Sequence, residues 1–251
     1  MWLHADRDGE GDPVVLVHGF TQTRNCWGPI ADDLRQDHTV VRVDAPGHGR
    51  SAELMAGLRG GGRLIADQGG EAVYVGYSMG GRYLIHLALG NPELVRGLVL
   101  IGATPGIEDP AERAERAAAD LATGRRIREL GLLDFLKAWI AAPMFAGLPS
   151  EHQFLLERME NTVEGLENSV IQAGTGRQDP SWDKLHRFSM PVLVVAGEDD
   201  EKYAAIGRRM ADAIGANATL AIIPGAGHAA HLERSDEFLA VLRTWMTENG
   251  L

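Results

Sequence analysis

The chain has 251 residues, of which 45% are hydrophobic, and its formal net charge at pH 7 is −11. This length supplies one large domain, or one domain that carries an insertion. The acidic balance disfavours nucleic acid and anionic membrane surfaces as partners, and an anionic small-molecule substrate would need a locally basic pocket.

The N-terminal stretch and the cysteine content indicate a cytoplasmic protein. MWLHADRDGE is polar and acidic, unlike a signal peptide. No apolar run approaches the ~20 residues that span a bilayer. Cys26 is the single cysteine, which excludes an intrachain disulfide and a cysteine-based zinc cluster. We expect no metal, no cofactor, and a monomer or small homo-oligomer.

Short apolar runs that alternate with helical stretches predict an α/β fold. The runs have the continuous hydrophobicity of strands buried on both faces, which favours a doubly wound, mostly parallel sheet. The predicted strands are Val14–Val17, Val40–Val43, Ala72–Val75, Leu98–Ile101, Val192–Ala196 and Leu220–Ile223, and the predicted helices are Pro29–Gln36, Ser78–Leu89, Ala204–Ile214 and Glu233–Thr247.

The stretch LRGGGRLIADQ, between the second and third predicted strands, carries three successive glycines, Gly60 to Gly62. Each glycine inside a helix costs about 0.8–1 kcal/mol relative to alanine. The stretch is not a phosphate loop, because no Gly-Lys-Ser/Thr follows it. We therefore predict a helix with a frayed start.

The middle of the chain breaks the alternation of strands and helices. Between Thr104 and Phe188 there are helix formers such as DPAERAERAAADLATGRRIREL and no convincing strand. This pattern predicts that residues 105–187 form a helical cap, inserted into a core made of residues 1–104 and 188–251.

Gly76-Tyr77-Ser78-Met79-Gly80 fits the pattern G-x-S-x-G at a strand-to-helix turn. In this turn the serine oxygen is exposed above the sheet, and the residues two before and two after it must be small, because strand and helix approach closely there. The pattern indicates that Ser78 is a catalytic residue. An ordinary helix cap is the alternative.

A serine hydroxyl needs a base, and the base needs an acid that orients it. GEDDEKY follows the fifth predicted strand and GAGHAAHLE follows the sixth, so the order serine, acid, histidine is met. We predict Asp200 as the acid and His228 as the base, with Asp199 solvated or capping the next turn. A histidine on a surface loop is the alternative for His228.

His231 and Glu233 lie just beyond His228. We interpret His231 as structural. The three residues could also suggest a metal site, but no second cluster of ligands accompanies them.

His18-Gly19-Phe20 ends the first predicted strand. A backbone N–H at this place can join that of Met79 in stabilising an oxyanion. We predict an oxyanion hole made by the amides of Phe20 and Met79, with a plain strand-ending turn as the alternative.

The motifs HGF, DAPGHGRS, GYSMGG, GEDD and GAGH, in this order, resemble the α/β-hydrolase superfamily over essentially the whole chain. More closely, HGFTQT, the arginine of GYSMGGR, WIAAPMF, GTGRQ and GEDDEKY resemble the 2-succinyl-6-hydroxy-2,4-cyclohexadiene-1-carboxylate (SHCHC) synthases of menaquinone biosynthesis. The resemblance implies an α/β-hydrolase fold and a lyase that eliminates pyruvate from a carboxylate-rich substrate.

The resemblance also implies substrate-binding residues, because arginine suits bidentate recognition of carboxylates. Position in the motifs favours Arg82 and Arg158 first and Arg116 after them, with Arg113 as the alternative to Arg116. For each of these arginines, a solvent-facing position on a helix is the alternative. Tyr77 is expected beside the site, and Trp139 and Phe145 are expected either in the pocket wall or in the core of the cap.

The triad pattern does not choose between two reactions, since both develop negative charge on a carbonyl oxygen. Our leading hypothesis is an SHCHC synthase-like carbon–oxygen lyase in which Ser78 acts in proton removal. The second is a hydrolase of an ester, a lactone or a carbon–carbon bond with Ser78 as nucleophile. The third is a non-catalytic receptor that keeps the fold.

Overall fold

The computed structural model describes residues 2–251, and within them the chain forms a seven-stranded sheet in the order β1-β3-β2-β4-β5-β6-β7. Every pair of neighbouring strands is parallel except β1 with β3. The strands are β1 (Ala5–Asp8), β2 (Pro13–Val17), β3 (Thr39–Val43), β4 (Ala72–Tyr77), β5 (Val95–Ile101), β6 (Val192–Gly197) and β7 (Ala218–Ile223). The six predicted strands are present.

Strand β1 was not predicted. Its sequence, ADRD, has no apolar run and only half-buried or exposed residues. Charged side chains suit an edge strand, since they discourage pairing with another chain. The strand therefore exists because its backbone pairs with β3, which a hydrophobic pattern does not report.

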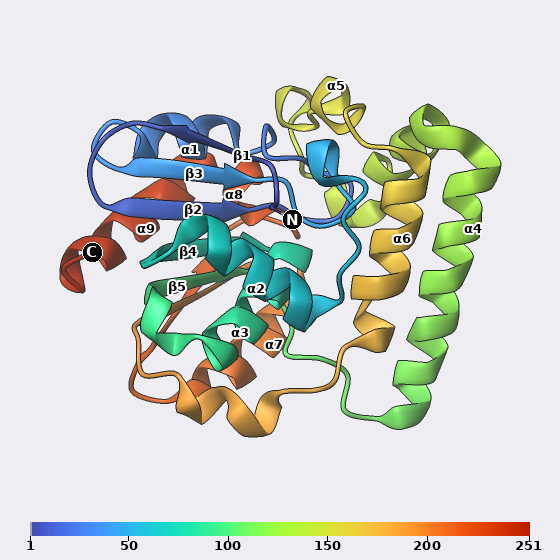
Figure 1. The fold of residues 1–251 in the computed structure, drawn as a ribbon. Coiled ribbons are helices and arrows are strands. Elements are labelled where there is room, and N and C mark those ends of the chain that lie inside the picture. The colour runs from blue at the N-terminus through green and yellow to red at the C-terminus, as the bar shows by residue number, and fades with distance from the viewer. Residues whose placement is uncertain (1) are drawn as a thin grey trace.

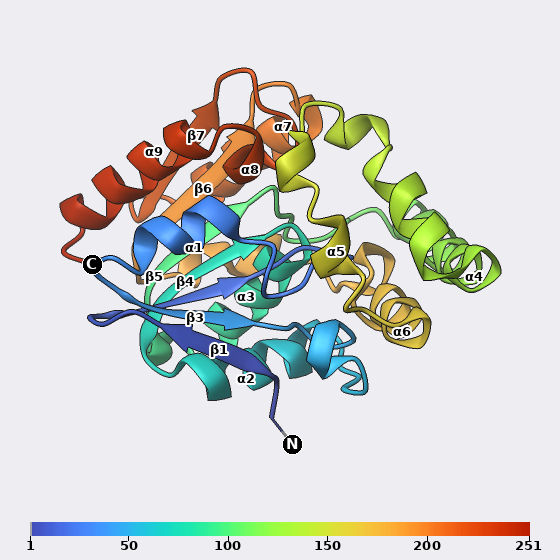
Figure 2. The same cartoon turned by 90° about the horizontal axis from the view of Figure 1, so that it is seen from above.

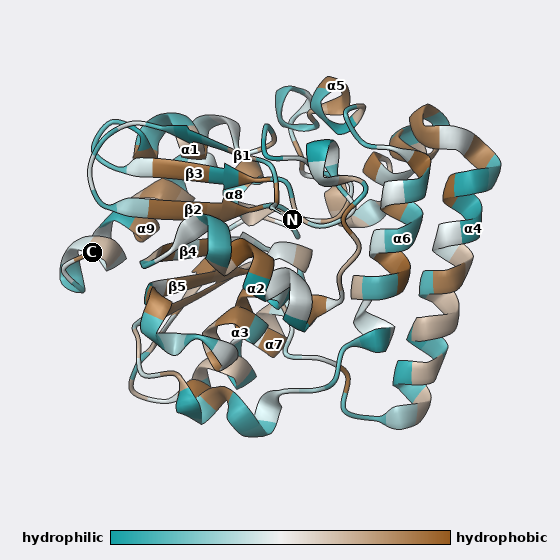
Figure 3. Cartoon of the chain, in the orientation of Figure 1, coloured by the Kyte–Doolittle hydropathy of each residue, from teal (hydrophilic) through white to brown (hydrophobic). Residues whose placement is uncertain are grey.

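Helices cover both faces of the sheet (Figure 2). Adjacent residues of one strand point to opposite faces, so Val15 contacts one hydrophobic core and Val14 the other. Figure 3 shows the central strands β2, β4 and β5 mainly in hydrophobic colours. One face carries α1 (Gly28–Leu34), α8 (Ala230–Glu233) and α9 (Ser235–Glu248), and the other carries α2 (Leu58–Gly69), α3 (Met79–Gly90) and α7 (Glu201–Ile214).

Helix α2 runs through all three glycines, so the predicted frayed start is wrong. A Cβ atom on Gly61 would lie 2.2 Å from the ring of Tyr83, and one on Gly62 would lie 2.9 Å from the Tyr83 carbonyl oxygen. These glycines let α2 pack closely against α3. The burial gained in this contact offsets the low helix propensity of glycine.

The segment between β5 and β6 contains helices and no strand within the described residues. Its two longest helices, α4 and α6, lie side by side beyond the sheet (Figure 1) and share a small apolar core. Asp109 caps α4 by accepting from two backbone N–H groups, and Gly131 interrupts that helix with φ 72°. The helices are α4 (Pro110–Ile140), α5 (Leu155–Arg158) and α6 (Val163–Ala173).

Six short 3₁₀ turns complete the secondary structure of residues 2–251: Gly49–Ser51, Pro92–Leu94, Pro143–Phe145, Ser150–His152, Thr175–Arg177 and Trp182–Arg187. Across this described part of the chain, no helix is both long enough and apolar enough to cross a membrane.

Candidate active site

Ser78 occupies a sharp turn between β4 and α3. Its φ is 50° and its ψ is −106°, a conformation that few non-glycine residues adopt. A Cβ atom on Gly80 would lie 1.9 Å from the carbonyl oxygen of Val17, and one on Gly76 would lie 2.6 Å from a backbone nitrogen of α3. The two glycines around the serine are therefore required by the close approach of β2, β4 and α3.

Ser78, His228 and Asp200 form a chain of hydrogen bonds. The Ser78 Oγ lies 3.1 Å from His228 Nε2, and His228 Nδ1 lies 2.6 Å from Asp200 Oδ2. The Tyr203 N–H donates to the other Asp200 oxygen at 3.3 Å. His228 is 3% exposed. Asp199 is exposed and takes no part in this chain.

The backbone N–H groups of Phe20 and Met79 are free. Within residues 2–251 neither has an acceptor in hydrogen-bond reach, and both residues border the space above Ser78. By contrast, the neighbouring Gly19 N–H donates to Gln22 Oε1 at 3.0 Å. Two free donors beside a serine can stabilise a negative oxygen.

A cavity of about 150 Å³ opens above Ser78, between the sheet and helices α4 and α6. Its wall is apolar at Phe20, Trp139, Met144 and Val170. The remaining lining residues are Ser78, Met79, Arg82, Arg116, Asp120, Thr123, Ser169, Ala173, Gly174, Thr175, Tyr203 and His228.

Arg82 brings a buried positive charge to this cavity. Its side chain donates to the carbonyl oxygen of Ala173 at 2.6 Å, and the residue is 8% exposed. Burial lowers the pKa of its guanidinium from the ordinary value. Among residues 2–251 no carboxylate lies within ion-pair distance of Arg82. Its direct partner is therefore a backbone carbonyl oxygen, while Asp120, which lines the same cavity, acts on it at longer range and pairs directly with Arg116.

The two other predicted arginines are held differently. Arg116 lines the cavity, but its Nε donates to Asp120 at 2.7 Å and its side chain is 44% exposed. Arg158 is buried, donates to the Gln153 carbonyl oxygen at 2.8 Å and to Thr21 Oγ1, and does not line the cavity.

The three predicted aromatic residues also differ in whether they line the cavity. Trp139 lines the cavity and its ring centroid lies 5.2 Å from that of Phe20. Tyr77 and Phe145 lie behind the lining, with centroids 5.5 and 6.4 Å from that of His228. Burial raises the pKa of Tyr77, so its phenol stays protonated.

Tyr203 was missing from the predicted site, although it lines the cavity and its ring centroid lies 4.6 Å from that of His228. Its position three residues after Asp200 was the available signal, because the first turn of a helix that follows a strand lies at the edge of the sheet where sites form.

His231 and Glu233 have structural contacts. The His231 ring lies 4.5 Å from Tyr77 and 5.1 Å from Trp27 between centroids, and burial lowers its pKa to about 3. The Glu233 carboxylate accepts from the N–H groups of Gly227 and Ala229 at 2.7 and 3.0 Å. In the described part of the chain, no three or more metal-ligating side chains cluster together.

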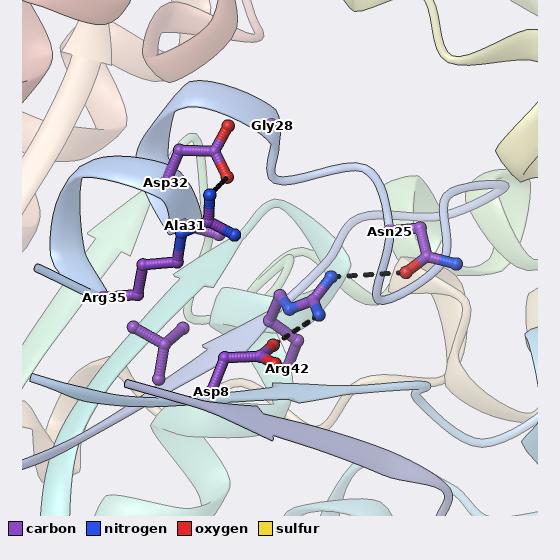
Figure 4. Close-up of a pocket in the computed structure, with 8 residues that line it drawn as sticks. Asp8, Asn25, Gly28, Ala31, Asp32, Arg35 and Arg42 are labelled. Atoms are coloured by element: carbon purple, nitrogen blue, oxygen red, sulfur yellow. Dashed lines mark hydrogen bonds and ion pairs between the residues drawn. The ribbon is translucent and has the colours of Figure 1, made fainter. Parts of the chain in front are cut away.

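A second hollow lies on the outer surface near β1, α1 and β3 (Figure 4). Arg42 pairs there with Asp8 at 2.6 Å, and Arg35 pairs with Asp32 at 3.4 Å. Its charges thus neutralise one another, and the cavity above Ser78 remains the candidate active site.

The fold and the Ser78 turn define the class of protein, and a family model agrees. Residues 14–241 match the model described as the alpha/beta hydrolase family, and the chain belongs to that family. It is 31% identical over 250 residues to the putative SHCHC synthase of Bacillus subtilis (strain 168), covering 94% of this chain and 90% of that protein. It is 30% identical over 258 residues to the SHCHC synthase of Serratia proteamaculans (strain 568), covering 97% of each.

The structure is similar to that of MenH from S. aureus, with a TM-score of 0.89 and 27% identity over 99% of each chain. The resemblance to the α/β-hydrolase superfamily and the closer resemblance to the SHCHC synthases are both confirmed. The protein is an enzyme whose relatives include SHCHC synthases.

Proposed function

We propose that this protein is an SHCHC synthase, a carbon–oxygen lyase that eliminates pyruvate from a carboxylate-rich cyclohexene substrate. The observation that carries the proposal is Arg82, a buried guanidinium that borders the cavity above Ser78 and, within residues 2–251, forms no direct ion pair with a carboxylate. A buried charge is costly unless it is paired, so the site favours a ligand that brings a carboxylate. Two relatives whose names give the same reaction, one of them as putative, align with nearly the whole of this chain, which supports the proposal.

In this proposal residues 105–187 form a cap that closes the site. Trp139 and Val170 from this segment would pack against the substrate ring, and Arg116 would reach a second carboxylate. Arg158 would act from behind the wall, through its charge and its hydrogen bond to Thr21.

Proton removal would begin at Ser78. His228 Nε2 takes the Ser78 proton, the serine oxygen takes a carbon-bound proton of the substrate, and Asp200 stabilises the imidazolium that results. The substrate's carbon–oxygen bond then breaks, and the departing enolate of pyruvate takes up the proton that the His228 imidazolium holds, which gives pyruvate and returns His228 to its neutral form. The 3.1 and 2.6 Å hydrogen bonds support this relay.

The Phe20 and Met79 amides would bind the oxygen on which negative charge develops when the proton leaves carbon. Hydrogen-bond donors that are fixed before the reaction stabilise such an enolate without reorganising. Their lack of any other acceptor within residues 2–251 supports this role.

One observation favours the second candidate, a hydrolase with Ser78 as nucleophile. Of the three predicted arginines, Arg158 lies outside the cavity lining and Arg116 is paired with Asp120, while much of the wall is apolar. An uncharged ester or lactone would fit such a wall.

The test is pyruvate release by the purified protein. The synthase substrate is generated in situ by the enzyme that makes it, and an aryl ester is assayed in parallel. We expect fast pyruvate release and little ester hydrolysis. Rapid ester turnover without pyruvate release would overturn the lyase assignment and make Ser78 a nucleophile.

A further inference from the structure

Thr21, the residue after Phe20, has a backbone conformation that β-branched residues rarely adopt. Its φ is 69° and its side chain is fully buried. The Gln22 N–H donates to the Gly19 carbonyl oxygen at 3.2 Å, so Phe20 and Thr21 are the central residues of a turn. A positive φ at the second central residue is type II geometry, which glycine normally supplies. A non-glycine residue there costs about 1–3 kcal/mol and persists only where its surroundings hold it.

Three side chains hold Thr21 in this conformation. Its N–H donates to His48 Nε2 at 3.3 Å, its carbonyl oxygen accepts from Asn161 Nδ2 at 2.8 Å, and its hydroxyl oxygen accepts from Arg158. His48 follows β3, whereas Asn161 and Arg158 belong to the segment between β5 and β6. The support therefore joins the two regions that border the cavity.

The hydrogen bonds of His48 fix its role as an acceptor. Its Nδ1 lies 3.1 Å from the Pro46 carbonyl oxygen, so Nδ1 carries the proton and Nε2 accepts from Thr21. Burial lowers the pKa of His48 to about 3, which keeps the ring neutral at ordinary pH.

Asn161 is 4% exposed and its amide is fully used. Its oxygen accepts from the Gly49 N–H at 2.9 Å, and its nitrogen donates to the carbonyl oxygens of Thr21 and Arg158 at 2.8 and 2.9 Å. This pattern sets the orientation of the amide, since a flipped group would place like partners against one another.

The consequence concerns Phe20. Within the turn, the N–H groups of Gly19, Thr21 and Gln22 all have acceptors, and the Phe20 N–H is left free beside the cavity. A return of Thr21 to negative φ would reverse the Phe20–Thr21 peptide, break its bond to His48 and displace the Phe20 backbone.

We propose that Asn161 is a positioning residue for the oxyanion hole, which holds Thr21 in the left-handed region and so aims the Phe20 N–H at the substrate. This inference rests on the proposed role of the Phe20 amide. It does not depend on which reaction is catalysed, because proton removal and ester hydrolysis both place negative charge on a carbonyl oxygen.

The first variant is Asn161→Asp, which keeps the acceptor for Gly49 and replaces the donor to Thr21 by an oxygen. We expect kcat to fall about 10- to 100-fold with KM changed less than about threefold, because a misplaced donor acts on the transition state. Asn217→Asp is the control for the same change of side chain at an exposed position, since the Asn217 amide donates to the Phe188 carbonyl oxygen at 2.8 Å, away from the cavity. An equal loss in the control, or a rise in KM alone, would overturn the proposal.

The sharper test repeats the Asn161 substitution in a Thr21→Gly background. Glycine adopts a φ of 69° without strain, so the support from Asn161 is needed less and the fall in kcat should shrink to less than about fivefold. An equal fall in both backgrounds would show that Asn161 does not act through Thr21. If Asn161→Asp does not fold, Asn161→Ala enters the same cycle.

Rates are measured for whichever reaction the wild-type protein catalyses, pyruvate release or aryl ester hydrolysis, so a failed lyase assignment leaves this test intact. A crystal structure of Asn161→Asp gives a readout without activity. We expect Thr21 at negative φ, and an unchanged turn would contradict the proposal.

Discussion

The two regions that border the cavity hold their side chains in different ways. In the sheet region, Ser78, His228 and Asp200 are joined by short hydrogen bonds at the ends of three strands. In the segment between β5 and β6, Arg116 is partly exposed and pairs with a neighbour on its own helix. Under the proposed function, the sheet would supply the chemistry and the helical segment would adjust which substrate reaches it.

The largest expected effect comes from breaking the sheet region at Ser78. For Ser78→Ala we expect turnover to fall by at least about 10³-fold, because the proton relay loses its first member. The melting temperature should stay close to that of the wild type, since within residues 2–251 the hydroxyl forms a single hydrogen bond, to His228. Pyruvate release and a thermal melt measure the two quantities, and near wild-type turnover would refute the assignment of Ser78.

A comparison of Arg82 with Arg116 sharpens the contrast. For Arg82→Ala we expect kcat/KM on the carboxylate-rich substrate to fall about 10- to 100-fold, because a charge-assisted hydrogen bond is lost in a buried place. For Arg116→Ala we expect less than about a fivefold fall, because solvent screens this residue.

Hydrolysis of an uncharged aryl ester is the control for both arginine variants and should change little. If Arg82→Ala reduced ester hydrolysis as strongly as pyruvate release, the residue would have a structural role and no special role toward carboxylates.

The α2–α3 contact offers a matched pair within the sheet region. A Cβ on Gly61 would lie 2.2 Å from the Tyr83 ring, whereas a Cβ on Gly60 would find its nearest atom at 3.5 Å. We expect Gly61→Ala to lower the free energy of unfolding by about 1–3 kcal/mol through overpacking. Gly60→Ala should raise it by up to about 1 kcal/mol through helix propensity. Urea unfolding measures both, and effects of the same sign would contradict the packing argument.

The smallest expected effect comes from replacing one buried histidine, which changes how the free energy of unfolding depends on pH. Burial lowers the pKa of His48 and His231 to about 3 and that of His18 and His86 to about 4. An unfolded histidine titrates near 6.5, so between about pH 6.5 and 4 the unfolded chain binds protons that the folded chain does not. The free energy of unfolding should therefore fall as the pH falls through this window.

Each such histidine contributes up to about 1.4 kcal/mol per pH unit in that window. For His231→Leu we expect a shallower decline by roughly that amount, measured by urea unfolding at pH 7, 6 and 5. An unchanged slope would mean that His231 already binds a proton in the folded protein.

Much of the fold was readable from the sequence, because a strand buried on both faces needs a continuous apolar run. The apolar runs at β2, β4, β5 and β6 indicate such buried strands directly, whereas β7 is an edge strand of apolar residues that is mostly half-buried. Strand β1 was not readable, since an edge strand is held by backbone pairing that charged side chains do not reveal. The prediction of a frayed start for α2 was wrong because its glycines allow close packing against Tyr83, which lies on another helix, α3.

The sequence by itself determined the Ser78 turn and the order of serine, acid and histidine, because steric limits at a strand-to-helix turn act on neighbouring residues. Only the tertiary structure decided that Tyr203 borders the cavity and that Arg158 lies outside its lining. Whether a helical side chain faces a cavity depends on how its helix packs against segments distant along the chain, and local periodicity does not encode that rotation. The hydrogen bond from Asn161 to the Thr21 carbonyl oxygen joins positions 140 residues apart, and it forms only once the chain has folded.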